Sequence, residues 1–86
     1  MKQFVVPVEV EPLEEGGFLA TCEAIQGCHA EGETIAEALD NLEDVARVLL
    51  ELSQEDGLPL PKGLTPAPLD RPLRAEIIVT APHAVR

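Results

Sequence analysis

The amino-acid sequence predicts an α+β fold of order β-β-β-α-β, in which one long helix packs on an antiparallel sheet. Three observations lead to this class. Residues 4–31 contain runs in which apolar and polar side chains alternate, as in a strand with one buried face. Residues 35–52 place apolar side chains at helical spacing. Residues 74–80 form a final β-branched run after a proline-rich stretch.

The first two predicted strands form a hairpin. The first covers residues 4–11, in which Pro7 has no N–H for the strand ladder and therefore favours an edge position. Residues 12–17 form a turn whose paired glycines supply positive φ. The second strand covers residues 18–24, and residues 28–31 are long enough for a short third strand.

The long helix has the clearest local signal in the chain. Thr34 and Glu37 have the spacing of a capping box, in which each side chain satisfies a backbone N–H at the start of a helix. The apolar period then covers residues 35–52, and Asp56 with Gly57 ends the helix. A helix of about 20 residues is about 30 Å long, enough to cross a small sheet.

The second half of this helix carries more apolar side chains than one sheet contact requires. Two accounts are open: the C-terminal loop folds over the excess, or the excess forms an interface with another subunit or a partner. Acidic side chains from the polar side of the helix join this candidate interface. The candidate residues are Glu43, Asp44, Val45, Val48, Leu49, Leu50 and Leu52.

We expect a single domain over residues 1–86. Its body covers residues 1–57, and the proline-rich residues 58–73 form an extended connector. Residues 74–81 form the last strand, which Pro82 ends. The chain has 86 residues and no Trp or Tyr, so it is expected to gain its remaining stability by self-association. We therefore expect a homo-oligomer, either a dimer or a tetramer.

The charge is acidic and unevenly distributed. Residues 1–60 carry 14 acidic and 2 basic side chains, a net −12, whereas residues 61–86 carry 2 acidic and 4 basic ones, a net +2. An acidic body repels phosphate backbones, and no basic residues alternate with aromatic ones, so direct nucleic-acid binding is disfavoured. A basic protein partner fits this charge better.

The cysteines and the hydropathy indicate the compartment. Two cysteines do not make a disulfide framework, and no secretory signal precedes them. No apolar run approaches the ~20 residues that cross a bilayer. We therefore expect a soluble, cytoplasmic protein with reduced thiols and no membrane contact.

The pair Cys28-His29 is the most conspicuous candidate for catalysis or metal binding. Neighbouring residues of a strand point to opposite faces, so these two side chains cannot pair with each other. A metal site would need Cys22 and His83 as well, and the spacing of the two cysteines matches no zinc motif. We expect both cysteines to be core residues and His29 to be exposed.

Other catalytic sites also lack support in the sequence. A metal-dependent nuclease needs about three or four carboxylates that converge on Mg²⁺. The strand acids lie mostly on the solvent face and the helix acids on the polar side, so we expect no such cluster. The chain has neither a glycine-rich phosphate loop nor the G-x-S-x-G motif. The sequence thus predicts no enzyme, no cofactor and no metal.

Several short motifs resemble the HicB-like antitoxin family. The matching segments are Gly16-Gly17-Phe18, Gly27-Cys28, Gly32-Glu33-Thr34, Glu37-Ala38-Leu39, Asn41 and Asp56-Gly57-Leu58-Pro59-Leu60-Pro61. Together they cover about residues 1–62 at the spacing of the family pattern. Glu23 and Gln26 replace the usual prolines of its C-P-x-L-P-G-C segment. The resemblance implies a partial ribonuclease H-like fold without a working active site.

The same resemblance implies a function. Members of the family typically form oligomers and mask HicA, a small basic toxin that cleaves mRNA, which agrees with the acidic charge of this chain. Full-length members often add a C-terminal DNA-binding domain, and we expect this chain to be a short form without one. We expect a non-enzymatic antitoxin-type protein that neutralises such a toxin. The alternative is a stand-alone oligomeric module, structural or ligand-binding, with no toxin partner.

Overall fold

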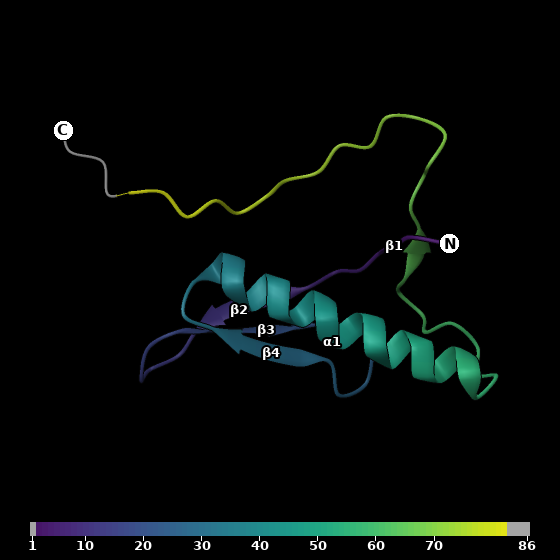
Figure 1. The fold of residues 1–86 in the computed structure, drawn as a ribbon, viewed down its shortest axis with the longest axis horizontal. Helices are drawn as coiled ribbons and strands as arrows, with labels where there is room; N and C mark the ends of the chain where they lie inside the picture. The colour runs from purple at the N-terminus through teal and green to yellow at the C-terminus, as the bar shows by residue number, and fades with distance from the viewer. Residues whose placement is uncertain (1, 83–86) are drawn as a thin grey trace.

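The computed structural model describes residues 2–82 and contains one long helix with antiparallel strands (Figure 1). The predicted α+β class is confirmed. The elements are β1 (Phe4–Val5), β2 (Glu9–Pro12), β3 (Phe18–Thr21), β4 (His29–Gly32), α1 (Ile35–Glu55) and β5 (Thr65–Pro66). Strands β2, β3 and β4 form one sheet in that order, and β1 with β5 forms a separate two-stranded ribbon.

The helix covers one face of the three-stranded sheet. Val10, Ala20 and Ala30 lie opposite one another across β2, β3 and β4 and pack into the core beneath α1. Ala20 and, on the helix, Ala38 are fully buried. Such small side chains allow the helix backbone to come close to the sheet.

The buried core is small and mostly aliphatic. Its side chains come from β3, the loop that follows it, α1 and the connector between α1 and β5. They are Ala20, Cys22, Ile25, Cys28, Ala38, Leu42 and Leu64. Both phenylalanines are half-buried at its margin.

The predicted helix start and end are confirmed. The Thr34 hydroxyl accepts a hydrogen bond of 3.0 Å from the Glu37 N–H, and the Glu37 carboxylate accepts one from the Glu33 N–H. These bonds satisfy donors that have no partner within the helix. At the other end, Gly57 takes a positive φ of 71° and its N–H donates to Gln54 O at 3.0 Å. Asp56 and Gly57 therefore end the helix as the sequence indicates.

The first predicted strand is interrupted in the structure. Residues 4–11 were expected to form one strand, but β1 ends at Val5 and β2 begins at Glu9. Pro7 lies in the gap and cannot donate to a ladder. As a result β1 turns away from β3 and pairs with β5 in the connector, Phe4 with Pro66 and Val5 with Thr65.

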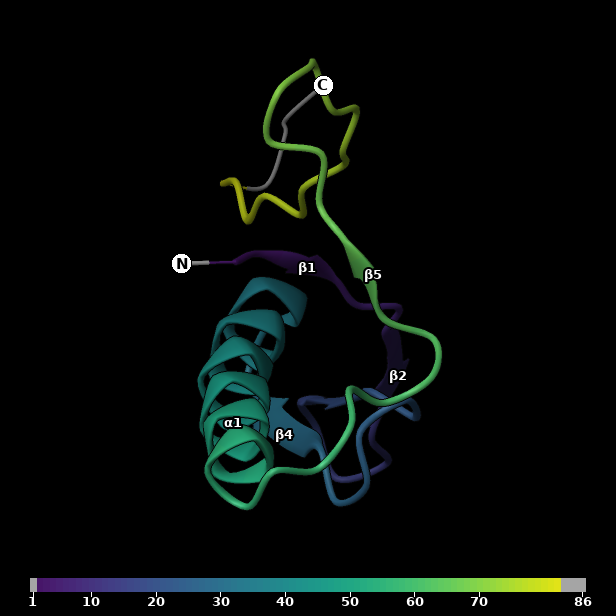
Figure 2. The same ribbon diagram turned by 90° about the vertical axis from the view of Figure 1, so that its right-hand side faces the viewer.

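The predicted last strand does not form within the chain. Residues 74–81 run as an extended, solvent-exposed segment with no strand assignment. In Figure 1 this segment runs above α1, and in Figure 2 it lies beyond the β1–β5 ribbon, so in both views it is apart from the three-stranded sheet. A strand forms only beside another strand, so the sequence pattern alone is not sufficient here.

Candidate functional site

The structure separates the side chains of Cys28 and His29. Cys28 is buried in the core, whereas the neighbouring His29, the first residue of β4, is exposed. The Cys22 N–H donates to the Cys28 carbonyl oxygen at 3.0 Å, which holds the two cysteine backbones side by side. The predictions that both cysteines lie in the core and that His29 faces solvent are confirmed.

The environment of the two thiols does not favour chemistry. Both cysteines are free and buried. Burial raises the pKa of the Cys28 thiol, and the adjacent Cys22 raises this pKa further. Because the thiolate is the reactive form, a raised pKa makes Cys28 a poor nucleophile at neutral pH. Among the described residues no His, Cys, Asp and Glu side chains group as metal ligands. His83 lies outside the described residues.

We expect the thiols to react slowly in the folded protein. Below denaturing urea concentrations, modification of Cys22 and Cys28 by a disulfide reagent such as DTNB should be roughly 100-fold slower than in the unfolded chain, because reaction requires local opening. The measurement is the rate of thiol release at mildly alkaline pH with and without urea. A native rate equal to the unfolded rate would contradict the assignment of both cysteines to the core.

The structure distributes the predicted interface residues between two environments. Val45, Leu49 and Leu50 are half-buried and pack against the core. Val48 and Leu52 are each 50% exposed. Glu43 and Asp44 are exposed as well, and Asp44 pairs with Arg47 at 2.7 Å. Of the predicted set, therefore, only Val48 and Leu52 leave a large apolar surface in contact with solvent.

Two further acidic residues belong to this surface and were missed in the sequence analysis. Counted from Asp44, exposed side chains recur at the three- and four-residue spacing that puts them on one side of a helix. This set, called here the helix stripe, is Asp44, Val48, Glu51, Leu52 and Glu55, and the exposed Arg47, paired with Asp44, lies beside it. The spacing was visible in the sequence, but the exposure of Leu52 was not. The helix stripe is thus an apolar pair bordered by carboxylates.

The connector lies beside the helix stripe without covering it. Leu64 enters the core, and Leu58 and Pro61 line a groove at the end of α1 together with Leu49 and Leu52. This groove has a volume of about 420 Å³. The connector therefore shields part of the apolar excess, while Leu52 and Leu58 stay exposed at the groove margin.

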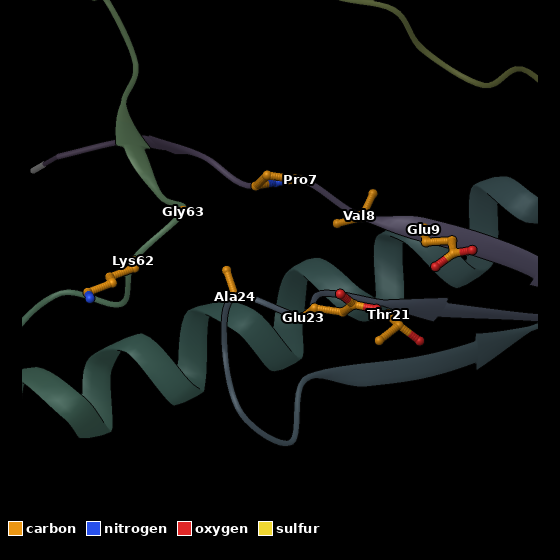
Figure 3. Close-up of a pocket in the computed structure, with 8 residues that line it drawn as sticks. All are labelled: Pro7, Val8, Glu9, Thr21, Glu23, Ala24, Lys62 and Gly63. Atoms are coloured by element: carbon orange, nitrogen blue, oxygen red, sulfur yellow. The ribbon is translucent and has the colours of Figure 1, made fainter.

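A second groove lies where β1 and β2 separate. Pro7 and Val8 form one side of this groove of about 440 Å³, and Lys62 and Gly63 of the connector also border it. Figure 3 shows Glu23 beside Thr21 at the end of β3, Glu9 above them, and Lys62 apart from both acids. With two exposed carboxylates near one end, this groove suits a positively charged group better than an anion.

No helix in residues 2–82 is both long enough and apolar enough to cross a membrane. The helix α1 has the length, but charged side chains recur along its polar side.

Comparison with known proteins places the chain among small bacterial relatives. It is 42% identical to the UPF0150 protein ssl0259 of Synechocystis sp. over 55 residues, which cover 64% of this chain and 75% of that protein. It is 40% identical to the UPF0150 protein ssl0738 of the same organism, over 58% of this chain and 74% of that protein. A third, ssr1765, is 33% identical over 56% of this chain and 61% of its own length. No protein-family model matches the chain.

Proposed function

The chain belongs to the UPF0150 family, and we propose that it acts within that family as a HicB-like, antitoxin-type protein. In this proposal it has no catalytic activity, associates with itself, and binds and neutralises a small basic toxin that cleaves mRNA. The antiparallel sheet with one long helix is compatible with the proposed HicB-like, partial ribonuclease H-like fold.

The helix stripe is the observation that carries the proposal. Val48 and Leu52 are half-exposed on a helix whose other apolar side chains are buried or half-buried. Exposed apolar residues of this kind, bordered by charge, are typical of protein interfaces. The bordering side chains Glu51 and Glu55 are both acidic, so the complementary surface is apolar and ringed by Lys or Arg.

The charge of the whole body supports a basic partner. Residues 1–60 carry a net −12, from 14 acidic and 2 basic side chains. Such a field attracts a cationic protein over about one Debye length, 8 Å at physiological salt, and accelerates its association. It also repels RNA, so a bound toxin would be held away from its substrate by charge as well as by steric masking.

We expect loss of partner binding when the helix stripe is made charged. The double variant Val48→Asp and Leu52→Asp should bind a small basic toxin, taken from the gene next to that of this chain, at least about 100-fold more weakly, because two aliphatic contacts are replaced by carboxylates that face the apolar centre of the partner surface. Titration calorimetry measures the affinity, and cleavage of an mRNA by the toxin measures the neutralisation.

The matched control is Leu60→Asp, which places the same charge on an exposed leucine of the connector. It should leave affinity and neutralisation within about threefold of the unmodified protein. The proposal fails if the unmodified chain neither binds nor inhibits the adjacent basic protein. If the double variant and the control bind the partner equally well, then the helix stripe is not the binding surface.

A further inference from the structure

Residues 73–82, called here the C-terminal arm, have the pattern of a strand but no strand partner within the described chain. In an extended arm, Ala75, Ile77 and Val79 form one wholly apolar face. The other face is mixed, since Ile78 lies there with Arg74, Glu76 and Thr80. Ile77 is 81% exposed and Val79 is 69% exposed. An isolated strand with an apolar face is not stable in water, so this arm requires a surface that covers it.

The dimensions of the chain lead to the same conclusion. The radius of gyration is 14.9 Å, whereas a compact domain of this length has one of about 12 Å. The arm and its connector account for the excess, since they extend beyond the β1–β5 ribbon in both views (Figures 1 and 2). The single chain thus leaves an apolar strand outside its own core.

The edges of the three-stranded sheet differ in accessibility. At the β4 edge, the side-chain amide of Asn41 donates to the Glu31 carbonyl oxygen at 2.8 Å, and α1 packs mainly over this strand. At the opposite edge, β2 has no neighbour beyond it in the sheet and makes the weakest contact with α1. Val8, directly before β2, is 45% exposed. The β2 edge is therefore the more accessible edge for a further strand, with Lys62 and Gly63 of the connector bordering the groove at its Val8 end.

The arm complements this edge in length, polarity and charge. Strand β2 has four residues, and the part of the arm that carries the wholly apolar face, residues 75–79, has five. Laid beside β2, the apolar face of the arm continues the surface of Val8 and Val10. Its other face then brings Arg74 to the side that carries Glu9, which lies across the ladder from Thr21.

We propose that the C-terminal arm of one copy of this chain adds as a strand to the β2 edge of a second copy, and that the second copy returns its own arm to the first. In the single chain the arm stays unpaired and lies apart from its own three-stranded sheet (Figures 1 and 2), which favours a second copy over self-pairing. Reciprocal exchange gives a closed two-fold dimer. This deepens the self-association in the proposed function, and its test needs no toxin.

The first test is the self-association of an arm variant. Ile77→Asp with Val79→Asp should weaken dimer formation at least about 100-fold in sedimentation equilibrium, because two aliphatic side chains in each of the two exchanged arms are no longer buried. Both side chains are exposed in the single chain, so the far-ultraviolet circular dichroism should stay that of the folded protein. Leu69→Asp is the control, since it charges an exposed leucine of the connector and should leave the dimer intact.

A mixing experiment tests whether the arm meets the β2 edge. Val8→Asp damages the edge and keeps the arm, whereas the double arm variant keeps the edge. A 1:1 mixture should associate more tightly than either variant alone and less tightly than the unmodified protein, because it can form one of the two exchanged contacts. A monomeric unmodified protein, an unaffected double arm variant, or a mixture no tighter than its components would each overturn the exchange. None of these outcomes bears on toxin binding through the helix stripe.

Discussion

Replacing Gly32 with alanine is expected to remove a large part of the stability of the protein. A Cβ atom at this position would lie 2.4 Å from the Ala38 backbone nitrogen and 2.8 Å from the Glu37 carbonyl carbon. Both are helix backbone atoms, so no side-chain rotation relieves the overlap. The helix must move away from β4, and we expect a loss of about 3 kcal/mol or more in the free energy of unfolding. Small domains have only about 5–15 kcal/mol in total.

Gly57→Ala is the comparison that separates this steric effect from the effect of an unfavourable backbone conformation. Gly57 takes a φ of 71°, which an alanine adopts at a cost of about 1–2 kcal/mol, and an added Cβ there meets no atom within 4 Å. Gly32 has no positive φ, so its requirement comes from the close approach alone. Urea unfolding followed by far-ultraviolet circular dichroism measures both variants. Equal midpoints, or a greater loss at Gly57, would contradict the close packing of α1 on β4.

The helix could be predicted because its signals are local. Thr34, Glu37 and Gly57 specify the helix ends through bonds to residues at most four positions away. The hairpin turn with paired glycines could be predicted for the same reason. Such interactions join residues that are close in the sequence, so the order of the residues is enough to recognise them.

The strand pairings that depend on distant residues could not be predicted. Phe4 pairs with Pro66 across 62 positions, in a ribbon of only two residues per strand. Phe4 and Val5 belong to the alternating run of residues 4–11, but that pattern does not specify the partner strand, and the two residues of β5 are too few to show an alternating pattern. Gly32 shows the same limit: in the sequence it is only the residue after the predicted third strand, residues 28–31, whereas the structure shows that the approach of α1 excludes a side chain.

The helix stripe was predicted only in part, because exposure depends on the relative lengths of helix and sheet. The helix α1 has 21 residues and is about 31 Å long, whereas the sheet strands have four residues and are about 13 Å long. The last turns of α1 therefore extend beyond the sheet. Leu52 lies in these last turns and stays exposed, although it continues the apolar period. Leu50, by contrast, packs against the core.

Leu42→Ala is expected to be the most destabilising truncation on the helix. Leu42 is 3% exposed and packs with Ala20 and Ala38 where α1 crosses the sheet. Removing its isobutyl group leaves a cavity, and the expected loss is about 2–5 kcal/mol in the free energy of unfolding. Urea unfolding at several protein concentrations measures this loss and separates it from any change in self-association.

Leu52→Ala is the matched comparison, because it removes the same atoms from the part of α1 that extends beyond the sheet. With half of its side chain already in water, it should lose less than about 1 kcal/mol in the free chain. The same variant should weaken binding of the basic partner, since Leu52 lies in the helix stripe. If Leu52→Ala instead destabilises the free protein as strongly as Leu42→Ala, then Leu52 is a core residue in solution. The helix stripe would then lack the exposed apolar surface on which the proposed function depends.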